Sequence, residues 1–151
     1  MLIWRGLVGR ADQIMKKRTR VSSGSSFESL AGYSRAVVVH EQEGDWIFVS
    51  GTTGYDYATG VISTNASEQL RQCFRNIEEA LKRTDSGLND IVRVRIYCAT
   101  RDVFGEIAPV IGEICRPFSP ANTTVIAELT SAEMLVEVEV TAQRQCVPIS
   151  L

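Results

Sequence analysis

The sequence predicts a single α+β domain in which two helices cover one face of a mixed β-sheet. Two observations support this prediction: the chain has 151 residues, 44% of them hydrophobic, and β-rich segments flank two segments with helical periodicity. The expected order along the chain is strand, strand, helix, strand, helix, strand, strand. A second domain is not expected.

The first two strands are predicted as a hairpin. Residues 34–39 and 46–50 are rich in β-forming side chains and flank the polar segment HEQEGD. The second strand continues into SGTTG, where glycines and hydroxyl side chains take the place of large apolar side chains. This ending is typical either of an ordinary turn or of a strand that ends at the wall of a small-molecule pocket.

The first helix follows Asn65, which can cap it, with Glu68 as the capping-box partner. Apolar residues at spacings of three and four then define one helix face: Leu70, Cys73, Phe74, Ile77 and Leu81. A second helix is predicted to begin after Asp102 as its cap and to end at RPFSP, with Pro109 inside it. Its apolar positions are Phe104, Ile107, Ile111, Ile114 and Cys115.

Between the helices, IVRVRIYCA alternates strictly, which places Val92, Val94, Ile96 and Cys98 on one face and Arg93, Arg95 and Tyr97 on the other. Residues 121–129 and 134–142 also alternate, and the short TSAE between them predicts a hairpin. The sheet face without helices would then carry Arg93, Arg95, Tyr97, Thr124, Glu137 and Glu139. A face so polar and so regular predicts a homo-oligomer with pockets at the subunit joints.

Charge and composition exclude several classes of protein. Residues 1–20 carry a net charge of +5, which leaves −7 for the remainder of a chain whose total is −2. This acidic body argues against nucleic-acid binding. The segment 1–20 is predicted to be a poorly ordered basic arm before a domain at 21–151, and MKKRTR from Met15 reads like a natural start.

No apolar run near the start is long enough for a signal peptide or a membrane span, so a cytoplasmic location without membrane contact is predicted. The cysteines, at 73, 98, 115 and 146, form no C-x-x-C pair, so no metal site is expected. They are predicted to be reduced thiols, most of them buried. His40 has no nucleophile or metal partner in its loop, which predicts a surface role.

Six motifs, in order, carry a family resemblance: GYSRAV, DWIFVSGTTG, QxxxNIEEAL, DIVRVRIY, PANTTV and VEVEVTA. Over about residues 27–144 the sequence resembles the reactive intermediate deaminase family, also called the Rid or YjgF family. The resemblance implies a chorismate-mutase-like fold and a homotrimeric barrel with clefts between subunits. It also implies hydrolysis of enamines or imines, such as 2-aminoacrylate, to keto acids and ammonia without a metal or organic cofactor.

Carried over by position, the resemblance implies that Tyr33, Gly51, Tyr97 and Thr124 line the cleft and that Glu137 holds the attacking water. One position departs from the deaminase pattern, because Asn122 stands where the deaminases have an Arg that pairs with the substrate carboxylate. An amide cannot form that bidentate ion pair. Simple 2-imino acids are therefore doubtful substrates.

Arg35 follows Tyr33 by two residues, so both side chains are expected on one strand face. Arg35 could pair with an anionic ligand in place of the missing Arg; the alternative is a solvated or inter-subunit ion pair. Glu137 and Glu139 could likewise pair with Arg93 or Arg95 across the sheet. The expected function is hydrolysis of an imine or enamine metabolite, and the alternative is a non-catalytic metabolite-binding or regulatory protein of the same fold.

Overall fold

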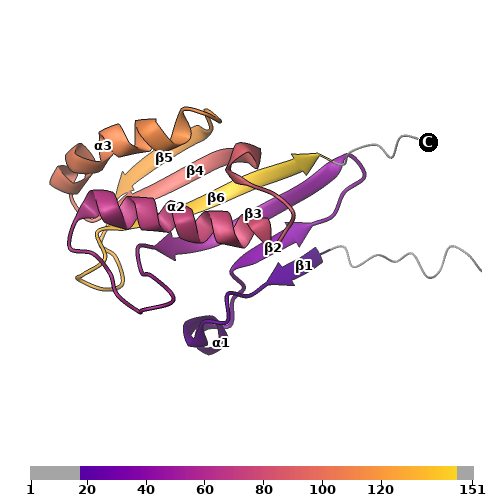
Figure 1. Ribbon diagram of the computed structural model, residues 1–151, viewed down its shortest axis with the longest axis horizontal. Helices are drawn as coiled ribbons and strands as arrows, with labels where there is room; N and C mark the ends of the chain where they lie inside the picture. The colour runs from indigo at the N-terminus through magenta and orange to yellow at the C-terminus, as the bar shows by residue number, and fades with distance from the viewer. Residues whose placement is uncertain (1–17, 146–151) are drawn as a thin grey trace, which may run out of the picture.

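The computed structural model describes residues 18–145, and one six-stranded sheet dominates them (Figure 1). Its strands are β1 (Arg18–Val21), β2 (Ala36–Val39), β3 (Gly44–Thr53), β4 (Ile91–Cys98), β5 (Ala121–Ile126) and β6 (Val136–Gln145). Their order is β1-β2-β3-β6-β4-β5, and all neighbours are antiparallel except β4 and β5. The helices are α1 (Ser26–Ala31), α2 (Ala66–Lys82) and α3 (Arg101–Cys115), with a 3₁₀ turn η1 (Leu88–Asp90) before β4.

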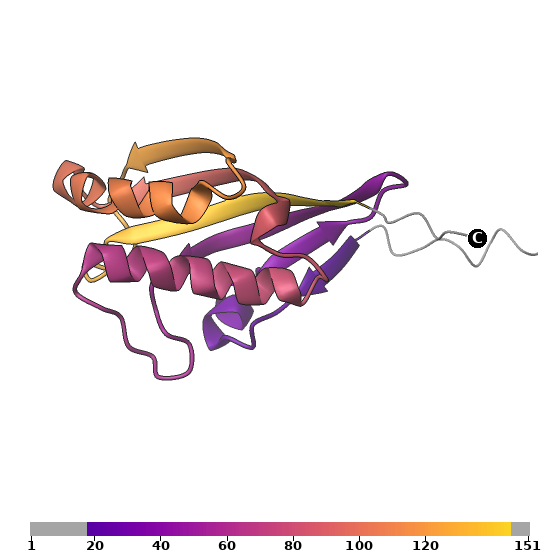
Figure 2. The ribbon, with the colours of Figure 1, turned by 45° about the horizontal axis from the view of Figure 1, so that its top comes forward.

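The two long helices, α2 and α3, lie side by side on one face of the sheet (Figure 2). The hydrophobic core lies between them and the strands, where the predicted apolar face of α2 is buried throughout. The opposite face is open, with Phe48 48% exposed and Val125 41% exposed. The predicted α+β architecture is confirmed. Within residues 18–145 no helix is long and apolar enough to cross a bilayer.

The local signals at the start of α2 and of the first hairpin are confirmed. The Asn65 side chain accepts a hydrogen bond from the Glu68 N–H at 2.9 Å, as an N-cap does. Strands β2 and β3 pair as the predicted hairpin, with Val37 opposite Phe48.

The predicted hairpin of the last two strands is wrong. β6 lies between β3 and β4, whereas β5 pairs parallel to β4 after the crossover through α3. Side-chain burial explains this order, because every second residue from Val136 to Ala142 is buried while β5 is mostly exposed. A strand with one fully apolar face belongs in the centre of a sheet, and a polar strand is tolerated at its edge.

The parallel register also corrects the position of Thr124. Thr124 is opposite Ile96, and residues opposite one another in a sheet share a face. Thr124 and Asn122 therefore lie on the helix side of the sheet, and Thr123 and Val125 share the open face with Arg95 and Tyr97.

Three further predictions need correction. Val92 is 41% exposed, because a register shift against β6 between Ile91 and Arg93 buries Ile91 instead. Thr100, not Asp102, caps α3 by accepting from the Val103 N–H, and Asp102 lies in the first turn, where its charge favours the helix N-terminus. Phe104 is 41% exposed rather than buried on the apolar face of α3.

The sequence did not predict β1 or α1. Arg18–Val21 pair with β2, so the expected boundary after residue 20 falls inside β1. The rest of the predicted arm, residues 1–17, and Cys146 lie outside the described residues.

Candidate functional site

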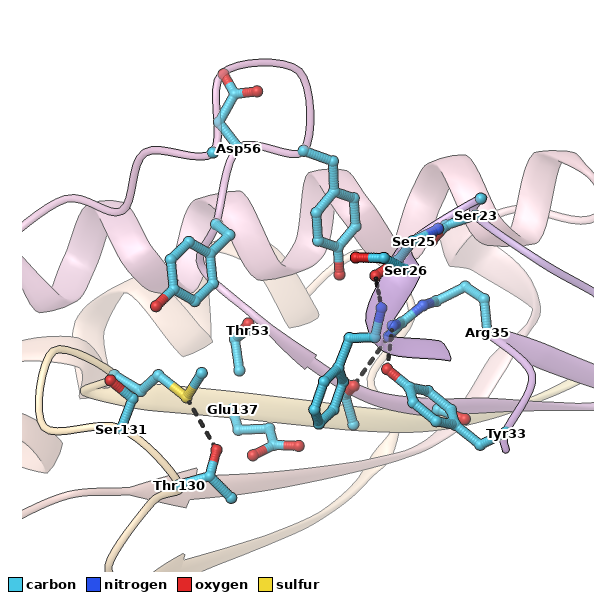
Figure 3. Close-up of a pocket in the computed structure, with 18 residues that line it drawn as sticks. Ser23, Ser25, Ser26, Tyr33, Arg35, Thr53, Asp56, Thr130, Ser131 and Glu137 are labelled. Atoms are coloured by element: carbon cyan, nitrogen blue, oxygen red, sulfur yellow. Dashed lines mark hydrogen bonds between the residues drawn. The ribbon is translucent and has the colours of Figure 1, made fainter. Parts of the chain in front are cut away.

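A pocket of about 800 Å³ opens beside the C-terminal end of β3 and the start of β6 (Figure 3). Segments far apart in the sequence form its walls: residues 23–27, the end of β3, the loop at 55–60 and the loop at 130–134. Tyr33, Arg35, Gly51 and Glu137 line it, as predicted for the cleft. In Figure 3, Tyr33 and Arg35 lie on one side of the pocket, and Thr130 and Ser131 on the other.

Helix α2 positions two of these loops through two buried amide side chains. Gln69 donates to the backbone oxygens of Ser63 and Glu133 and accepts from the Leu135 N–H, at 2.6 to 2.8 Å. Asn76 donates to the Thr53 and Tyr55 oxygens at 3.1 and 2.8 Å. Because buried amides satisfy these carbonyl groups, the pocket walls are fixed to the helix layer rather than left as free loops.

Glu137 is the candidate acid–base group. It lies at the start of β6, opposite Thr53 on one side and Tyr97 on the other, and therefore on the open face. Burial raises the pKa of Glu137 and the carboxylate of Glu139 raises it further, while Arg35 opposes them. Within residues 18–145 the Glu137 carboxylate has no ion pair and no hydrogen bond, so the predicted alternative of a salt bridge to Arg93 or Arg95 is not what the structure shows.

Gly51 explains the unusual end of β3. A Cβ atom at this position would clash with Oε1 of Glu137 and would lie 3.0 Å from its Cδ. The strand has no side chain here because the Glu137 carboxyl group fills that space. The SGTTG segment therefore ends at a pocket wall rather than at an ordinary turn.

Replacing Gly51 by Ala is expected to push the Glu137 carboxyl group out of this space without unfolding the protein. The atoms displaced are the far end of a flexible side chain, so the melting temperature should change by less than about 4 °C. The pKa of Glu137, measured by NMR titration, should fall because the group loses burial. Gly105→Ala in α3, where a Cβ meets nothing within 4 Å, is the matched control. An unchanged pKa in Gly51→Ala would contradict this account of the glycine.

Arg35 lines the pocket but is already paired within its own chain. Its Nε donates to Oε1 of Glu28 at 3.0 Å, and the two side chains are 6% and 3% exposed. Its terminal nitrogens donate to the Gly51 oxygen, the Thr52 hydroxyl and the Tyr33 hydroxyl, at 2.9 to 3.2 Å. The Arg35 side chain is therefore buried and paired rather than solvated, and a bidentate pair with an anionic ligand would have to break these bonds.

Glu28 holds Arg35 in place beside the pocket, and the sequence did not indicate this role. Besides the bond from Arg35, the Glu28 carboxylate accepts hydrogen bonds from the Ser22 hydroxyl, the Ser23 hydroxyl and the Ser23 N–H, at 2.6 to 3.0 Å. Burial would raise the pKa of Glu28, but the hydrogen bonds from Ser23, Ser22 and Arg35 outweigh it and lower the pKa below its usual value. A Glu in a Ser-rich segment looks solvated from the sequence, and no local pattern shows its partner seven residues later.

The remaining predicted site residues lie apart from the pocket. Tyr97 is next to Glu137 across β4 and β6, but it does not line the cavity. Asn122 and Thr124 are on the edge strand β5, where the Thr124 hydroxyl donates to the Asn122 side-chain oxygen at 3.1 Å. One chain therefore carries two separated groups of predicted site residues.

The other predicted polar positions have structural partners. Arg95 and Glu139 form the cross-strand ion pair expected for Glu139. His40 lies near the surface, away from the pocket, with Nε2 2.8 Å from the Thr19 hydroxyl and Nδ1 3.1 Å from Asp45. Cys73, Cys98 and Cys115 are free and buried, as predicted, and burial raises the pKa of Cys115 to about 11. Across residues 18–145 no group of three potential metal-binding side chains comes together.

The sheet order, the helix layer and the pocket beside Glu137 define a small α+β domain with a pocket at one end of its sheet. The chain belongs to the Endoribonuclease L-PSP family, whose model matches residues 23–144, and its relatives carry the names RutC, UK114 and YjgF. The Rid/YjgF membership predicted from the six motifs is thereby confirmed.

The chain is similar in sequence to two relatives and in sequence and fold to one solved structure. Rv2704 of Mycobacterium tuberculosis, a member of the YjgF/YER057c/UK114 family, is 36% identical with a TM-score of 0.71, covering 83% of this chain and 98% of that one. A RutC family protein of Pyrococcus abyssi is 29% identical over 75% of this chain and 87% of its own. A 2-iminobutanoate/2-iminopropanoate deaminase of Dermatophagoides farinae is 27% identical, over 76% of this chain and 88% of its own.

Proposed function

We propose that this protein hydrolyses an imine or enamine metabolite to a carbonyl compound and ammonia, without a metal or organic cofactor, and that Glu137 is its general base. The observation that carries the proposal is a half-buried carboxyl group with a raised pKa, which faces a pocket and has no hydrogen-bond or ion-pair partner within residues 18–145. Such a group is suited to accept a proton from a bound water near neutral pH. The deaminase activity named for the Dermatophagoides farinae relative agrees with this reaction class.

The proposed reaction adds one water and needs no other reagent. An enamine first tautomerises to the imine. Water oxygen then bonds to the carbon of the C=N group while one of its protons passes to Glu137, the electron pair of the C=N double bond moves to the nitrogen, and Glu137 returns the proton to that nitrogen. The C–N bond of the resulting carbinolamine then breaks as the hydroxyl proton passes to the amino group, which releases ammonia, forms the carbonyl group and leaves Glu137 as a carboxylate. The protein contributes position and a proton acceptor.

We further propose that the complete site lies between the subunits of a homotrimer in the cytoplasm. The separation of Tyr97, Asn122 and Thr124 from the pocket supports this, because edge strand β5 of a neighbouring subunit could complete the wall that the pocket lacks. The open sheet face, with Phe48 and Val125 exposed, is a suitable surface for the contact. In analytical ultracentrifugation the protein is expected to sediment with the mass of a trimer. A monodisperse monomer would exclude the arrangement.

The direct test is an assay with imines generated in solution. An amino-acid oxidase or a dehydratase supplies 2-imino acids, including 2-aminoacrylate, and an amine oxidase supplies imines that carry no carboxylate. Semicarbazide trapping follows the decay of both kinds. The protein is expected to accelerate decay above the buffer rate for at least one of them. No acceleration with any substrate would favour the second candidate function.

That second candidate is a binding or regulatory protein with the same fold, and Asn122 is the observation that favours it. A carboxylate-binding Arg is missing at this position, and Arg35 is already paired with Glu28. If only the anion contact is missing, Asn122→Arg should gain activity toward 2-imino acids by about tenfold or more, the effect of one charge-assisted pair. An inert Asn122→Arg variant, alongside an inert parent, would support binding without catalysis.

A further inference from the structure

The charged groups around the pocket do not favour an anion. Among the described lining residues, Arg35 is the one basic side chain, and Asp56 and Glu137 are acidic. The charge of Arg35 is offset by Glu28, whose carboxylate lies directly against it. The Asp56 carboxylate accepts from the Ala58 and Thr59 N–H groups within its own turn and points away from the cavity in Figure 3. The Glu137 carboxylate therefore faces the pocket with no unpaired cation from residues 18–145 beside it, and the local potential is negative.

The other notable feature of the walls is their aromatic content. Phe27, Tyr33, Tyr55 and Tyr57 line the pocket together with Met134. One ring face of Tyr33 and one of Tyr57 already contact a cation within the chain, since the Arg35 guanidinium carbon lies 5.5 and 5.8 Å from their centroids. Phe27 meets Tyr33 edge-on at 6.1 Å, and Phe27 and Tyr57 are 59% and 46% exposed. These exposed rings offer apolar surface to a ligand.

We propose that this pocket takes a cationic ligand with an apolar or aromatic body, an iminium or ammonium group that lies between Glu137 and the tyrosine rings. Aromatic faces and carboxylates are the groups with which proteins bind organic cations. A small 2-imino acid, by contrast, would bring its carboxylate next to that of Glu137.

This inference rests on the proposed function for its chemical meaning. A negative pocket keeps the imine nitrogen protonated, and the protonated C=N carbon is the better electrophile for water. The substrate class would then be amine-derived imines with an apolar substituent and no carboxylate beside the C=N group. The binding preference itself can be tested without any reaction.

The test compares three unreactive probes that share one ring: benzylamine as the cation, benzyl alcohol as the neutral probe and benzoate as the anion. Their dissociation constants are measured with the full chain by calorimetry or by chemical-shift titration at neutral pH. Benzylamine is expected to bind about tenfold more tightly than either of the others, the effect of about 1.4 kcal/mol from ring faces and a carboxylate. Equal or tighter binding of benzoate, or no detectable binding of benzylamine, would overturn the proposal.

Variants identify the groups responsible. Glu137→Gln should remove most of the preference for benzylamine over benzyl alcohol, and Tyr57→Leu should reduce it while Tyr57→Phe keeps it, because Phe retains the ring face. Glu113→Gln, in an exposed pair with Arg71 far from the pocket, is the control. A preference that survives both Glu137→Gln and Tyr57→Leu would place the cation elsewhere and overturn the assignment.

The outcome also separates this inference from the proposed function. A protein that prefers benzylamine but hydrolyses no imine keeps the inference and loses the proposed reaction. A protein that hydrolyses 2-imino acids and prefers benzoate keeps the reaction and loses the inference.

Discussion

Replacing Glu137 by Gln is expected to lower the rate constant for imine hydrolysis by about 10²- to 10⁴-fold, the usual contribution of a positioned general base. Gln has the same shape but cannot accept the proton of the attacking water. The fold should survive, because Glu137 makes no ion pair within residues 18–145 that the change would break. The measurement is the trapping assay with purified wild type and variant at equal concentration.

Glu139→Gln is the matched control, since Glu139 is two residues along the same strand face and pairs with Arg95. It should retain most of the activity but change its pH dependence. Burial and the Glu139 charge both raise the pKa of Glu137, so wild-type activity should rise with pH through a midpoint above that of an ordinary Glu. Removing the Glu139 charge leaves burial opposed by Arg35, and the midpoint should move to lower pH. Equal losses in both variants, or a Glu137→Gln enzyme with full activity, would contradict the role of Glu137.

Replacing Glu28 by Gln is expected to lower the free energy of unfolding by about 3 kcal/mol, which is typical when one partner of a buried ion pair is removed. The change leaves the Arg35 guanidinium, 6% exposed, without its counter-charge. Urea denaturation at neutral pH measures the loss. Glu113→Gln in the exposed Arg71 pair should change stability little, because exposed ion pairs contribute little.

The pH dependence of this difference follows from the direction of the pKa shift. The pKa of Glu28 is lowered in the folded state, so its contribution is fully present above the unfolded-state pKa and is lost as the pH falls through the folded-state pKa. Wild type and Glu28→Gln should therefore converge in stability in acid. A double variant, Glu28→Gln with Arg35→Met, should recover much of the lost stability, because a buried charge is then absent. If the double variant is less stable than Glu28→Gln, the ion pair is not the cause.

The sequence was sufficient for features that depend on local pattern. The helical spacing of Leu70, Ile77 and Leu81 predicted the buried face of α2, and Asn65 was confirmed as its cap. The motifs also selected Tyr33, Gly51 and Glu137, which the structure places around one pocket. Their roles remain predictions until the variants are measured.

The sequence was insufficient where pairing between distant segments decides the outcome. Alternation in β5 could not show that α3 would carry it to a parallel position, and so Thr124 was assigned to the wrong face. The burial of Glu28 depends on Arg35 and two serines, each of which looks solvated in its own segment. Tyr57 enters the pocket through a loop whose path depends on Asn76 of α2.

The central place of β6 has a consequence for synthesis on the ribosome. A nascent chain that has emerged only as far as β5 carries β3 and β4 with no strand between them, since each pairs with β6 in the finished sheet. Their unpaired edges and the apolar side of the helices stay exposed to water until residues 136–145 leave the exit tunnel. The sheet can therefore close only after β6 has emerged, and incomplete chains that stop before Val136 are the ones most exposed to aggregation.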